Sequence, residues 1–279
     1  MEGKIIKIIS NLMSVEAGDK IYNCKPRGKF YHDKLTPLVG DKVIIDEVNN
    51  YILEILPRKN VLSRPAIANI DGCIIVTSLK LPNLSLFLLD KILSLVISNN
   101  IKPIICFTKK DLLTSEELKS VQKIYDYYNS IGMPAIYNDE LNKLDELISG
   151  MTIVLTGQTG AGKSSLLNRL NPKFNLQTNE ISKALGRGVH TTRHTEFFKY
   201  KSSLIADTPG FSSLDLNTLT KENIRDSFIE FNYDCKFKDC YHINEQNCSV
   251  KKRVQNKEIL ESRYENYLKM LNEKDKNYR

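Results

Sequence analysis

A glycine-rich stretch in the middle of the chain constrains the fold more than any other part of the sequence. Residues 157–164 read GQTGAGKS and match the pattern G-x-x-x-x-G-K-[ST]. They follow the apolar run TIVLT and precede SSLLNRL, whose leucines have helical spacing. A buried strand, a glycine turn and a helix in this order are typical of a layered α/β domain. We therefore expect a central α/β domain built around this loop.

The loop contains the residue types that hold the phosphates of a nucleotide. Its glycines allow backbone N–H groups to turn toward a β-phosphate, and Lys163 can neutralise β- and γ-phosphate oxygens. The hydroxyl of Ser164 is suited to binding Mg²⁺. The sequence predicts a phosphate-binding loop formed by Gly157, Gln158, Thr159, Gly160, Ala161, Gly162, Lys163, Ser164 and Ser165.

Other apolar runs on both sides of the loop predict further strands of the same sheet. DGCIIVTS (71–78), KPIICFTK (102–109) and SSLIADTPG (202–210) are continuous runs bounded by turn residues, as buried parallel strands are. LFLLDKILSLVISNN (86–100) has the spacing of a helix between the first two. Because ligands bind at the carboxyl ends of parallel strands, we expect the site at that edge, in a domain spanning residues 66–211.

Two segments after the phosphate loop predict the rest of a magnesium and γ-phosphate site. Asp207 and Gly210 belong to DTPG, where a carboxylate can hold Mg²⁺ through water and a glycine N–H can meet the γ-phosphate. The loop GRGVHTTRH (186–194) has threonines that can complete the Mg²⁺ shell only while the γ-phosphate is present. Thr192 is our first choice for this ligand, and Thr191 is the second.

The segment TKKD, residues 108–111, predicts which base the site reads. It follows the apolar run PIIC, so it lies at the carboxyl end of a strand beside the same crevice. Asp111 offers two acceptor oxygens to the adjacent N1–H and 2-amino donors of guanine, a pair that adenine lacks. Lys109 can lie across the base, Thr108 can bond between loops, and Lys110 completes the predicted nucleotide site. The pattern favours GTP, and a P-loop ATPase or kinase is the alternative.

Three of the six cysteines cluster with a histidine in a polar stretch near residue 240. Cys235, Cys240, His242 and Cys248 supply three thiols and one imidazole, a set suited to tetrahedral Zn²⁺. Their close spacing favours a structural ion that folds its own loop, and the cluster has no C-x-x-C pattern of a redox site. We expect one structural zinc ion in a mostly helical region, residues 212–279. Its last segment predicts one apolar helical face, formed by Leu260, Tyr264, Tyr267, Leu268 and Leu271.

The first 65 residues contain short strand-like runs separated by turn signals. KIIKII, AGDKIYNC, VGDKVIIDEV and YILEIL follow one another closely, with an Asn-Asn turn before the last. Short strands at this spacing predict a small barrel of the OB type over residues 1–65. Its segment PRGKFYHDK interleaves basic and aromatic residues, which can bind phosphates and stack bases. A polar barrel loop over two packed rings fits the same pattern.

Net charge and hydropathy bear on the partners and the location of the protein. The net charge of +7 is spread along the chain, so it supports a polyanionic partner only weakly. The most apolar segment is interrupted by Asp90 and Lys91 and is too short for a membrane span. The first residues, MEGKIIKIIS, lack the pattern of a secretory leader. We expect a cytoplasmic monomer that does not contact a membrane.

Taken together, these segments resemble the RsgA family of circularly permuted GTPases, also called the YjeQ family. In that family an OB barrel precedes a GTPase domain whose base-reading segment comes before the phosphate loop, and a zinc-binding domain follows. The resemblance covers nearly the whole chain. It rests on RGKF (27–30), VGDKV (39–43), RPAIANIDG (64–72), TKKDLL (108–113), GQTGAGKSSLLN (157–168), GRGVHTTRH (186–194), DTPGF (207–211), the cysteine and histidine cluster, and RYENYLKML (263–271).

The resemblance implies a GTPase that binds the small ribosomal subunit late in its assembly and is stimulated by it. It also implies that the barrel and the zinc domain contact rRNA, and that the protein leaves when GTP is hydrolysed to GDP. A nucleotide-gated RNA-binding clamp whose hydrolysis is incidental is the alternative.

Two positions bear on how such a GTPase would work. Thr108 replaces the asparagine that usually opens the base-reading motif, which predicts weaker or different bonding between loops. Phe211 stands where many small GTPases have a glutamine that orients water, and a phenyl ring cannot do this. The resemblance implies that His190 in the switch loop is the catalytic residue, because a neutral imidazole can hold or polarise the attacking water. His194 is the rival.

Overall fold

The structure is a computed structural model of the protein. The side chains of Ser63, Asp207, Lys276 and Asn277 are not described. The described residues are 1–28, 30, 35–63, 66–171, 196–207, 218–231, 235, 237 and 239–277.

The chain begins with a closed barrel. Its strands are β1 (Glu2–Ile9), β2 (Leu12–Ala17), β3 (Lys20–Pro26), β4 (Lys42–Asp46) and β5 (Tyr51–Ile55). They pair in the order β1-β2-β3-β5-β4, and β4 returns to β1 to close the ring. Alternate side chains point inward, as in β2, where every second residue is buried. The fully buried core includes Ile5, Val15, Cys24, Val43 and Ile52. The predicted OB-type barrel is therefore confirmed.

A central sheet follows the barrel. Its strands β8 (Gly72–Ser78), β9 (Lys102–Thr108), β10 (Ala135–Tyr137), β11 (Thr152–Gly157) and β13 (Ser203–Asp207) are parallel, and β12 (Glu196–Tyr200) is antiparallel. Their order is β10-β9-β8-β11-β13-β12. This is the α/β sheet that the apolar runs predicted.

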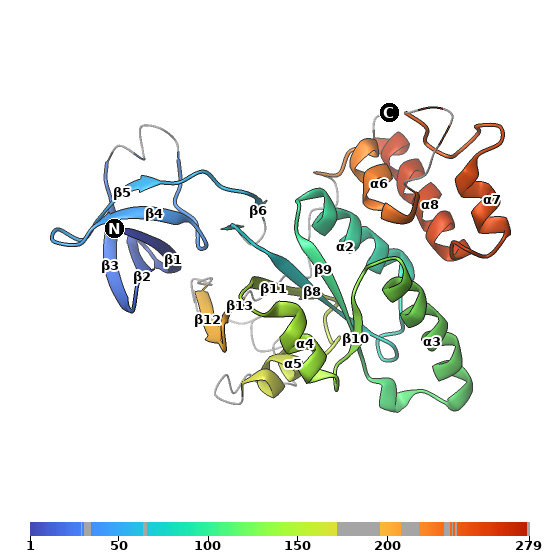
Figure 1. The fold of residues 1–279 in the computed structure, drawn as a ribbon, viewed down its shortest axis with the longest axis horizontal. Coiled ribbons are helices and arrows are strands. Elements are labelled where there is room, and N and C mark those ends of the chain that lie inside the picture. The colour runs from blue at the N-terminus through green and yellow to red at the C-terminus, as the bar shows by residue number, and fades with distance from the viewer. Residues whose placement is uncertain are drawn as a thin grey trace.

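Helices cover both faces of this sheet. They are α2 (Leu86–Ser98), α3 (Ser115–Ser130), α4 (Leu141–Ile148) and α5 (Lys163–Leu170), and Figure 1 shows α2 and α3 on one side with α4 and α5 on the other. Successive residues of β8 point to opposite faces: Ile75 packs in the cluster with α2 and α3, whereas Ile74 packs in the cluster with α4 and α5. Both faces are buried, which explains why the parallel strands read as continuous apolar runs.

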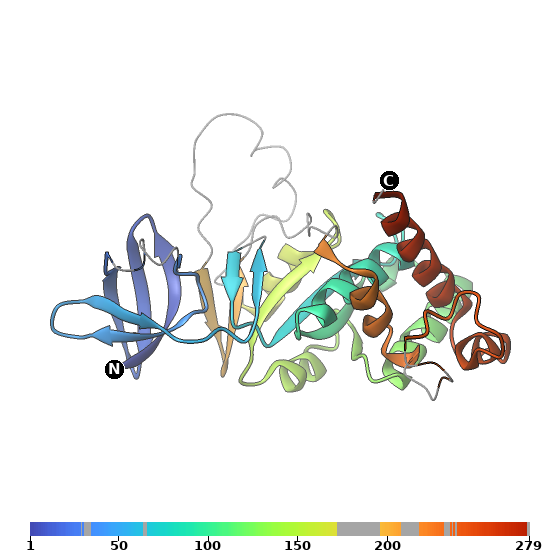
Figure 2. The same ribbon diagram turned by 90° about the horizontal axis from the view of Figure 1, so that it is seen from above.

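The barrel and the central sheet are connected through strands. A hairpin of β6 (Val61–Ser63) and β7 (Ala66–Ala68) joins them along the chain, and β1 of the barrel pairs with β12 at the edge of the central sheet. The result is a continuous run of eleven paired strands within the described residues. Figure 2 shows the barrel beside this edge, at the end of the molecule opposite to the C-terminal helices.

The C-terminal region is mostly helical. It contains α6 (Lys221–Ser227), a short 3-10 turn η5 (Ile229–Phe231), α7 (Ser249–Gln255) and α8 (Glu261–Asn277). Its apolar cluster includes Leu95 of α2, so the region packs on the central domain. Tyr264, Tyr267, Leu268 and Leu271 of the predicted apolar face belong to this cluster. Among the described segments, none of the helices has the length and apolar character needed to cross a membrane.

Candidate functional site

The phosphate loop joins β11 to α5, as its sequence predicted. Gly157 has φ of +138°, and a Cβ at this position would lie 2.0 Å from the carbonyl oxygen of Val76 on neighbouring β8. Only glycine permits this close approach of the two strands. Gly162 immediately precedes α5 with φ of +97°. The loop therefore needs these two glycines to turn from the sheet into the helix, with the first N–H groups of α5 directed at the site.

The side chain of Lys163 folds back over this loop. Its ammonium donates to the carbonyl oxygens of Gly157 at 2.7 Å and Gln158 at 2.8 Å. Burial lowers the pKa of Lys163, because its charge is partly removed from water. These neutral carbonyls are weaker partners for the ammonium than the oxygens of a phosphate would be. The lysine is thus held at the place where anionic ligands would approach the loop.

The TKKD segment and the phosphate loop meet at the same edge of the sheet. The hydroxyl of Thr108 is buried and donates to the carbonyl oxygen of Ala161 at 2.6 Å. This bond joins the two loops directly, as the sequence analysis allowed for Thr108; whether it is weaker than or different from the bonding of asparagine stays a prediction. Asp111 lies exposed in a short 3-10 turn, η1 (Lys110–Leu112), just after β9. Two distant segments of sequence thus form one crevice.

Lys109 and Lys110 point to different neighbours. Lys109 adopts φ of +61°, and its ammonium donates to the carbonyl oxygen of Leu81 in the loop after β8. The ammonium of Lys110 lies 4.3 Å from the ring centre of Tyr137 and 3.3 Å from a carboxylate oxygen of Asp139. Lys110 is therefore directed at the loop after β10 rather than along the crevice with Lys109.

The loop after β10 was not recognised as part of the site from its sequence. Asn138 donates its backbone N–H to the carbonyl of Phe107 at 2.9 Å, and its own carbonyl accepts from Arg169 of α5 at 3.1 Å. These bonds place residues 138–140 beside the TKKD segment. The available signal was their position after an apolar strand, since YNDEL has no distinctive motif of its own.

The predicted magnesium and switch residues are only partly described. The backbone of Asp207 ends β13, and β13 is the parallel neighbour of β11, with Ala206 beside Val154. Asp207 therefore emerges at the same edge as the phosphate loop. Thr191, Thr192, His190, His194, Gly210 and Phe211 lie outside the described residues.

The cysteine and histidine cluster is assembled around one imidazole nitrogen. Nδ1 of His242 lies 3.7 Å from the sulfur of Cys235, 3.2 Å from that of Cys240 and 3.5 Å from that of Cys248. Sulfur and nitrogen ligands of tetrahedral Zn²⁺ are about 3.6 Å apart, given the usual metal–ligand bond lengths. Burial lowers the pKa of His242, which favours the neutral imidazole that binds metals. The ligand atoms of Cys235, Cys240 and His242 lie within 4.8 Å of one another, so these three residues fit a metal ion such as zinc, and the thiol of Cys248 lies beside the same imidazole.

Helix α8 is bonded to the loop that carries this cluster through two tyrosine hydroxyls. The hydroxyl of Tyr264 donates to the carbonyl of His242 at 2.6 Å, and that of Tyr267 donates to the carbonyl of Tyr241 at 2.7 Å. The ring of Phe231 packs edge-on against the imidazole, with 5.9 Å between the ring centres. The cluster is thus attached to the apolar core of the C-terminal region, as expected for a structural site.

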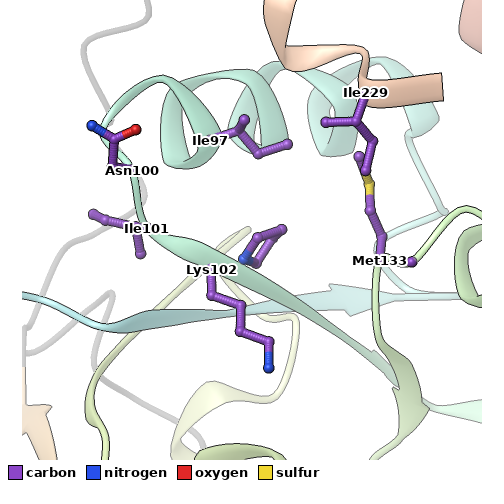
Figure 3. A pocket seen from close by; sticks show the side chains of 8 residues that line it. Ile97, Asn100, Ile101, Lys102, Met133 and Ile229 are labelled. Carbon is purple, nitrogen blue, oxygen red and sulfur yellow. The ribbon is translucent and has the colours of Figure 1, made fainter. Parts of the chain in front are cut away.

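A separate pocket of about 410 Å³ lies at the other end of the parallel strands. Figure 3 shows Ile97 of α2, Met133 of the turn after α3 and Ile229 of η5 around it. Lys102 and Pro103 mark the start of β9, whereas TKKD and the phosphate loop follow the carboxyl ends of β9 and β11. This pocket is therefore not part of the crevice formed by TKKD and the phosphate loop.

Comparison with known proteins identifies the family. Residues 55–217 match the family model described as RsgA GTPase, and residues 2–51 match that of the RsgA N-terminal domain. The small ribosomal subunit biogenesis GTPase RsgA 2 of Oceanobacillus iheyensis is 44% identical, over 98% of this chain and 97% of the relative. The RsgA of Staphylococcus aureus is 42% identical, over 97% and 96%.

Solved structures agree with this assignment. YjeQ from Thermotoga maritima has a TM-score of 0.84 at 34% identity and covers 98% of both chains. YloQ, described as a circularly permuted GTPase, has a TM-score of 0.83 at 36% identity and covers 99% of this chain and 95% of its own. The order of TKKD before the phosphate loop, with both at one edge, is this permuted arrangement. The chain belongs to the RsgA family of circularly permuted GTPases and is a GTP hydrolase.

Proposed function

We propose that this GTPase binds the small ribosomal subunit and assists its late maturation. In this proposal the subunit stimulates GTP hydrolysis, and hydrolysis drives release of the protein. The observation that carries the proposal is the 42–44% identity, over nearly the full length of both chains, to relatives named for biogenesis of that subunit. The Thr108–Ala161 bond supports a shared nucleotide site, because it joins TKKD to the phosphate loop.

The nucleotide site is proposed to use two groups of residues. Asp111 accepts hydrogen bonds from N1–H and the 2-amino group of guanine, with the stem of Lys109 across the base. Lys163 releases the loop carbonyls and neutralises the β- and γ-phosphates, whose charge attracts it more strongly. The loop N–H groups bind the same phosphates. The proposed set also includes Thr108, Lys110, Gln158, Thr159, Ala161, Ser165, Gly210 and the glycines at 157, 160 and 162.

Ser164, Thr192 and Asp207 are proposed to hold Mg²⁺ with GTP. The ion, when bound, would supply positive charge to the phosphate oxygens during hydrolysis. His190 is proposed to hold the attacking water, since Phe211 offers no polar group for this purpose.

We further propose that residues 1–65, 66–211 and 212–279 act as the barrel, the GTPase domain and the zinc-binding domain. The barrel and the zinc-binding domain are proposed to contact rRNA. The convergence of the sulfurs of Cys235, Cys240 and Cys248 on Nδ1 of His242 supports zinc as the structural ion.

The test measures GTP hydrolysis by the full chain with purified small subunits, with large subunits and with neither. We expect stimulation by small subunits alone. Equal turnover in all three samples would overturn the proposed role of the subunit and favour a passive clamp. Competition with ATP in the same assay checks the preference for guanine.

A pair of histidine variants tests the proposed catalytic residue. His190→Ala should lower stimulated turnover by about 100-fold, because the water loses its partner, while GTP affinity stays unchanged. His194→Ala serves as the matched variant in the same loop. Loss of turnover in His194→Ala alone would transfer the role to that residue.

A further inference from the structure

The turn between β8 and α2 borders the nucleotide crevice. Leu79 at its start donates a backbone hydrogen bond to the carbonyl of Thr108 at 3.1 Å. The hydroxyl of Ser78 donates to the carbonyl of Lys80 at 2.8 Å, and this bond fixes the backbone path just after β8. Residues 80–82, which we name the β8 turn, therefore leave the sheet beside the first residue of TKKD.

The β8 turn touches both loops of the crevice. The carbonyl oxygen of Leu81 accepts a hydrogen bond from the ammonium of Lys109. A Cβ on Gly160 of the phosphate loop would lie 3.7 Å from Cδ of Pro82. The turn thus reaches from the base-reading segment to the phosphate loop. A nucleotide with its base at Asp111 and its phosphates at Lys163 would have its sugar along this stretch.

Leu81 has an unusual backbone conformation for its residue type. Its φ is +57°, and among the described non-glycine residues with positive φ it is the only one with an aliphatic side chain. This conformation is unfavourable for residues with a branched side chain, whereas glycine adopts it freely. The side chain of Leu81 is 70% exposed, so core packing does not explain why a leucine stands here. Such an outlier beside a ligand site indicates a functional constraint.

The turn is also held from outside the crevice. The ammonium of Lys80 contacts both carboxylate oxygens of Glu117 at 2.9 and 3.0 Å. Glu117 itself caps the start of α3 by accepting from the backbone of Thr114. The turn is therefore positioned before a ligand arrives, which reduces the entropy lost on binding.

We propose that Leu81 is a nucleotide-contacting residue. Its side chain packs against the nucleoside between base and phosphates, and its carbonyl orients Lys109 across the base. This inference rests on the proposed guanine site at residues 108–111. It adds a third element, the β8 turn, to the phosphate loop and TKKD.

The variant Leu81→Gly tests the contact with the nucleotide, and its melting temperature shows whether the fold is kept. Loss of the apolar contact should weaken GDP binding by about 5-fold, measured by titration calorimetry with unlabelled GDP. The nucleotide-free protein should keep or raise its melting temperature, because glycine removes the strain at φ of +57°. Lys257→Gly is the matched control, since Lys257 is exposed with φ of +64° in the C-terminal region. It should leave GDP affinity unchanged. Wild-type GDP affinity in Leu81→Gly overturns the inference.

A second variant distinguishes this inference from the proposed site itself. Asp111→Asn should weaken GDP binding and shift preference toward xanthosine diphosphate, whose 2-oxo group suits an amide donor. If Asp111→Asn binds GDP like the wild type, the guanine site is misplaced and the role of Leu81 falls with it. If Asp111→Asn behaves as expected while Leu81→Gly binds normally, only the role of Leu81 is wrong.

Discussion

The central domain is attached to its two neighbours in different ways. The barrel joins it through backbone pairing, because β1 pairs with β12 at Lys7 and Glu196, and a bridge links Val39 to Ile67. A side-chain bond from Lys4 to Thr152 adds to this pairing. The C-terminal region joins it through side chains, because Arg263 of α8 reaches into the interface with α2 and η5. Figure 1 and Figure 2 show these two junctions at opposite ends of the central domain.

The side-chain junction is a buried network of charges. Arg263 is 1% exposed and donates to Asp90 of α2 at 2.6 Å and to both carboxylate oxygens of Glu230 at 2.7 and 2.9 Å. Asp90 also accepts from Tyr128 of α3 at 2.9 Å and from Asn266 of α8 at 2.6 Å. The bonds of Asp90 depend on one relative position of α2, α3 and α8. A buried network of this kind allows little sliding.

The charged pair at the β1–β12 pairing is less buried than the network of Arg263. The ion pair of Lys7 and Glu196 is partly exposed, with side-chain exposures of 38% and 26%. The strand β12 immediately follows residues 172–195, which contain the proposed switch threonine. The C-terminal region is thus fixed to helices, whereas the barrel is bonded to the strand that leads out of the proposed switch segment. We expect the barrel to respond more directly to the nucleotide state.

The largest expected effect comes from metal removal. Chelation should unfold the loop around Cys235, Cys240, His242 and Cys248, because binding of structural zinc contributes on the order of 10 kcal/mol to folding in small zinc modules. Hydrogen exchange should then show lost protection in residues 239–259 and unchanged protection in the barrel. Metal analysis should find one zinc per chain. Full protection in the metal-free protein would contradict a structural role for zinc in the C-terminal region.

The next largest loss of stability is expected when the buried charge network of Arg263 is broken. Arg263→Met leaves Asp90 and Glu230 buried without their partner and should cost about 3–5 kcal/mol in the free energy of unfolding, measured with denaturant. Arg253→Met is the control, because Arg253 pairs with Glu258 near the surface. Its loss should cost less than about 1 kcal/mol. Similar costs for both variants would contradict the special contribution of the buried network.

The smallest effect is expected at the barrel junction. A double-mutant cycle of Lys7→Met and Glu196→Gln should give a coupling energy of about 0.2–1 kcal/mol, because the pair is open to solvent. The cycle is measured in the same denaturant assay. A coupling energy comparable to the loss in Arg263→Met would show that both junctions depend equally on charge.

Much of the fold followed from local pattern. The continuous apolar runs predicted β8, β9, β11 and β13, because both faces of the sheet are covered. The barrel was predicted from its strands, although β2 was missed as a separate strand. Its alternation of buried Met13, Val15 and Ala17 with less buried residues was the available signal.

The features that the sequence did not predict depend on contacts between residues far apart in the chain. Asp90 and Lys91 were interpreted as interruptions of an apolar segment, yet Asp90 is fully buried and its partner is 173 residues away. Thr108 was expected to bond between loops, more weakly than the usual asparagine or in a different way. Its 2.6 Å bond to Ala161 depends on how closely the loops approach, which no local pattern records. The strain at Leu81 is likewise a property of the assembled crevice.

The Asp90–Arg263 pair also has a consequence for synthesis of the chain. A ribosome makes the protein from its first residue, so α2 is complete long before Arg263 leaves the exit tunnel. Until then the carboxylate of Asp90 has no cation in the place where it will be buried, and burial of an unpaired charge is unfavourable. Burial of Asp90 must therefore wait for α8. A nascent chain stalled before residue 263 should leave the Asp90 side of α2 open to water.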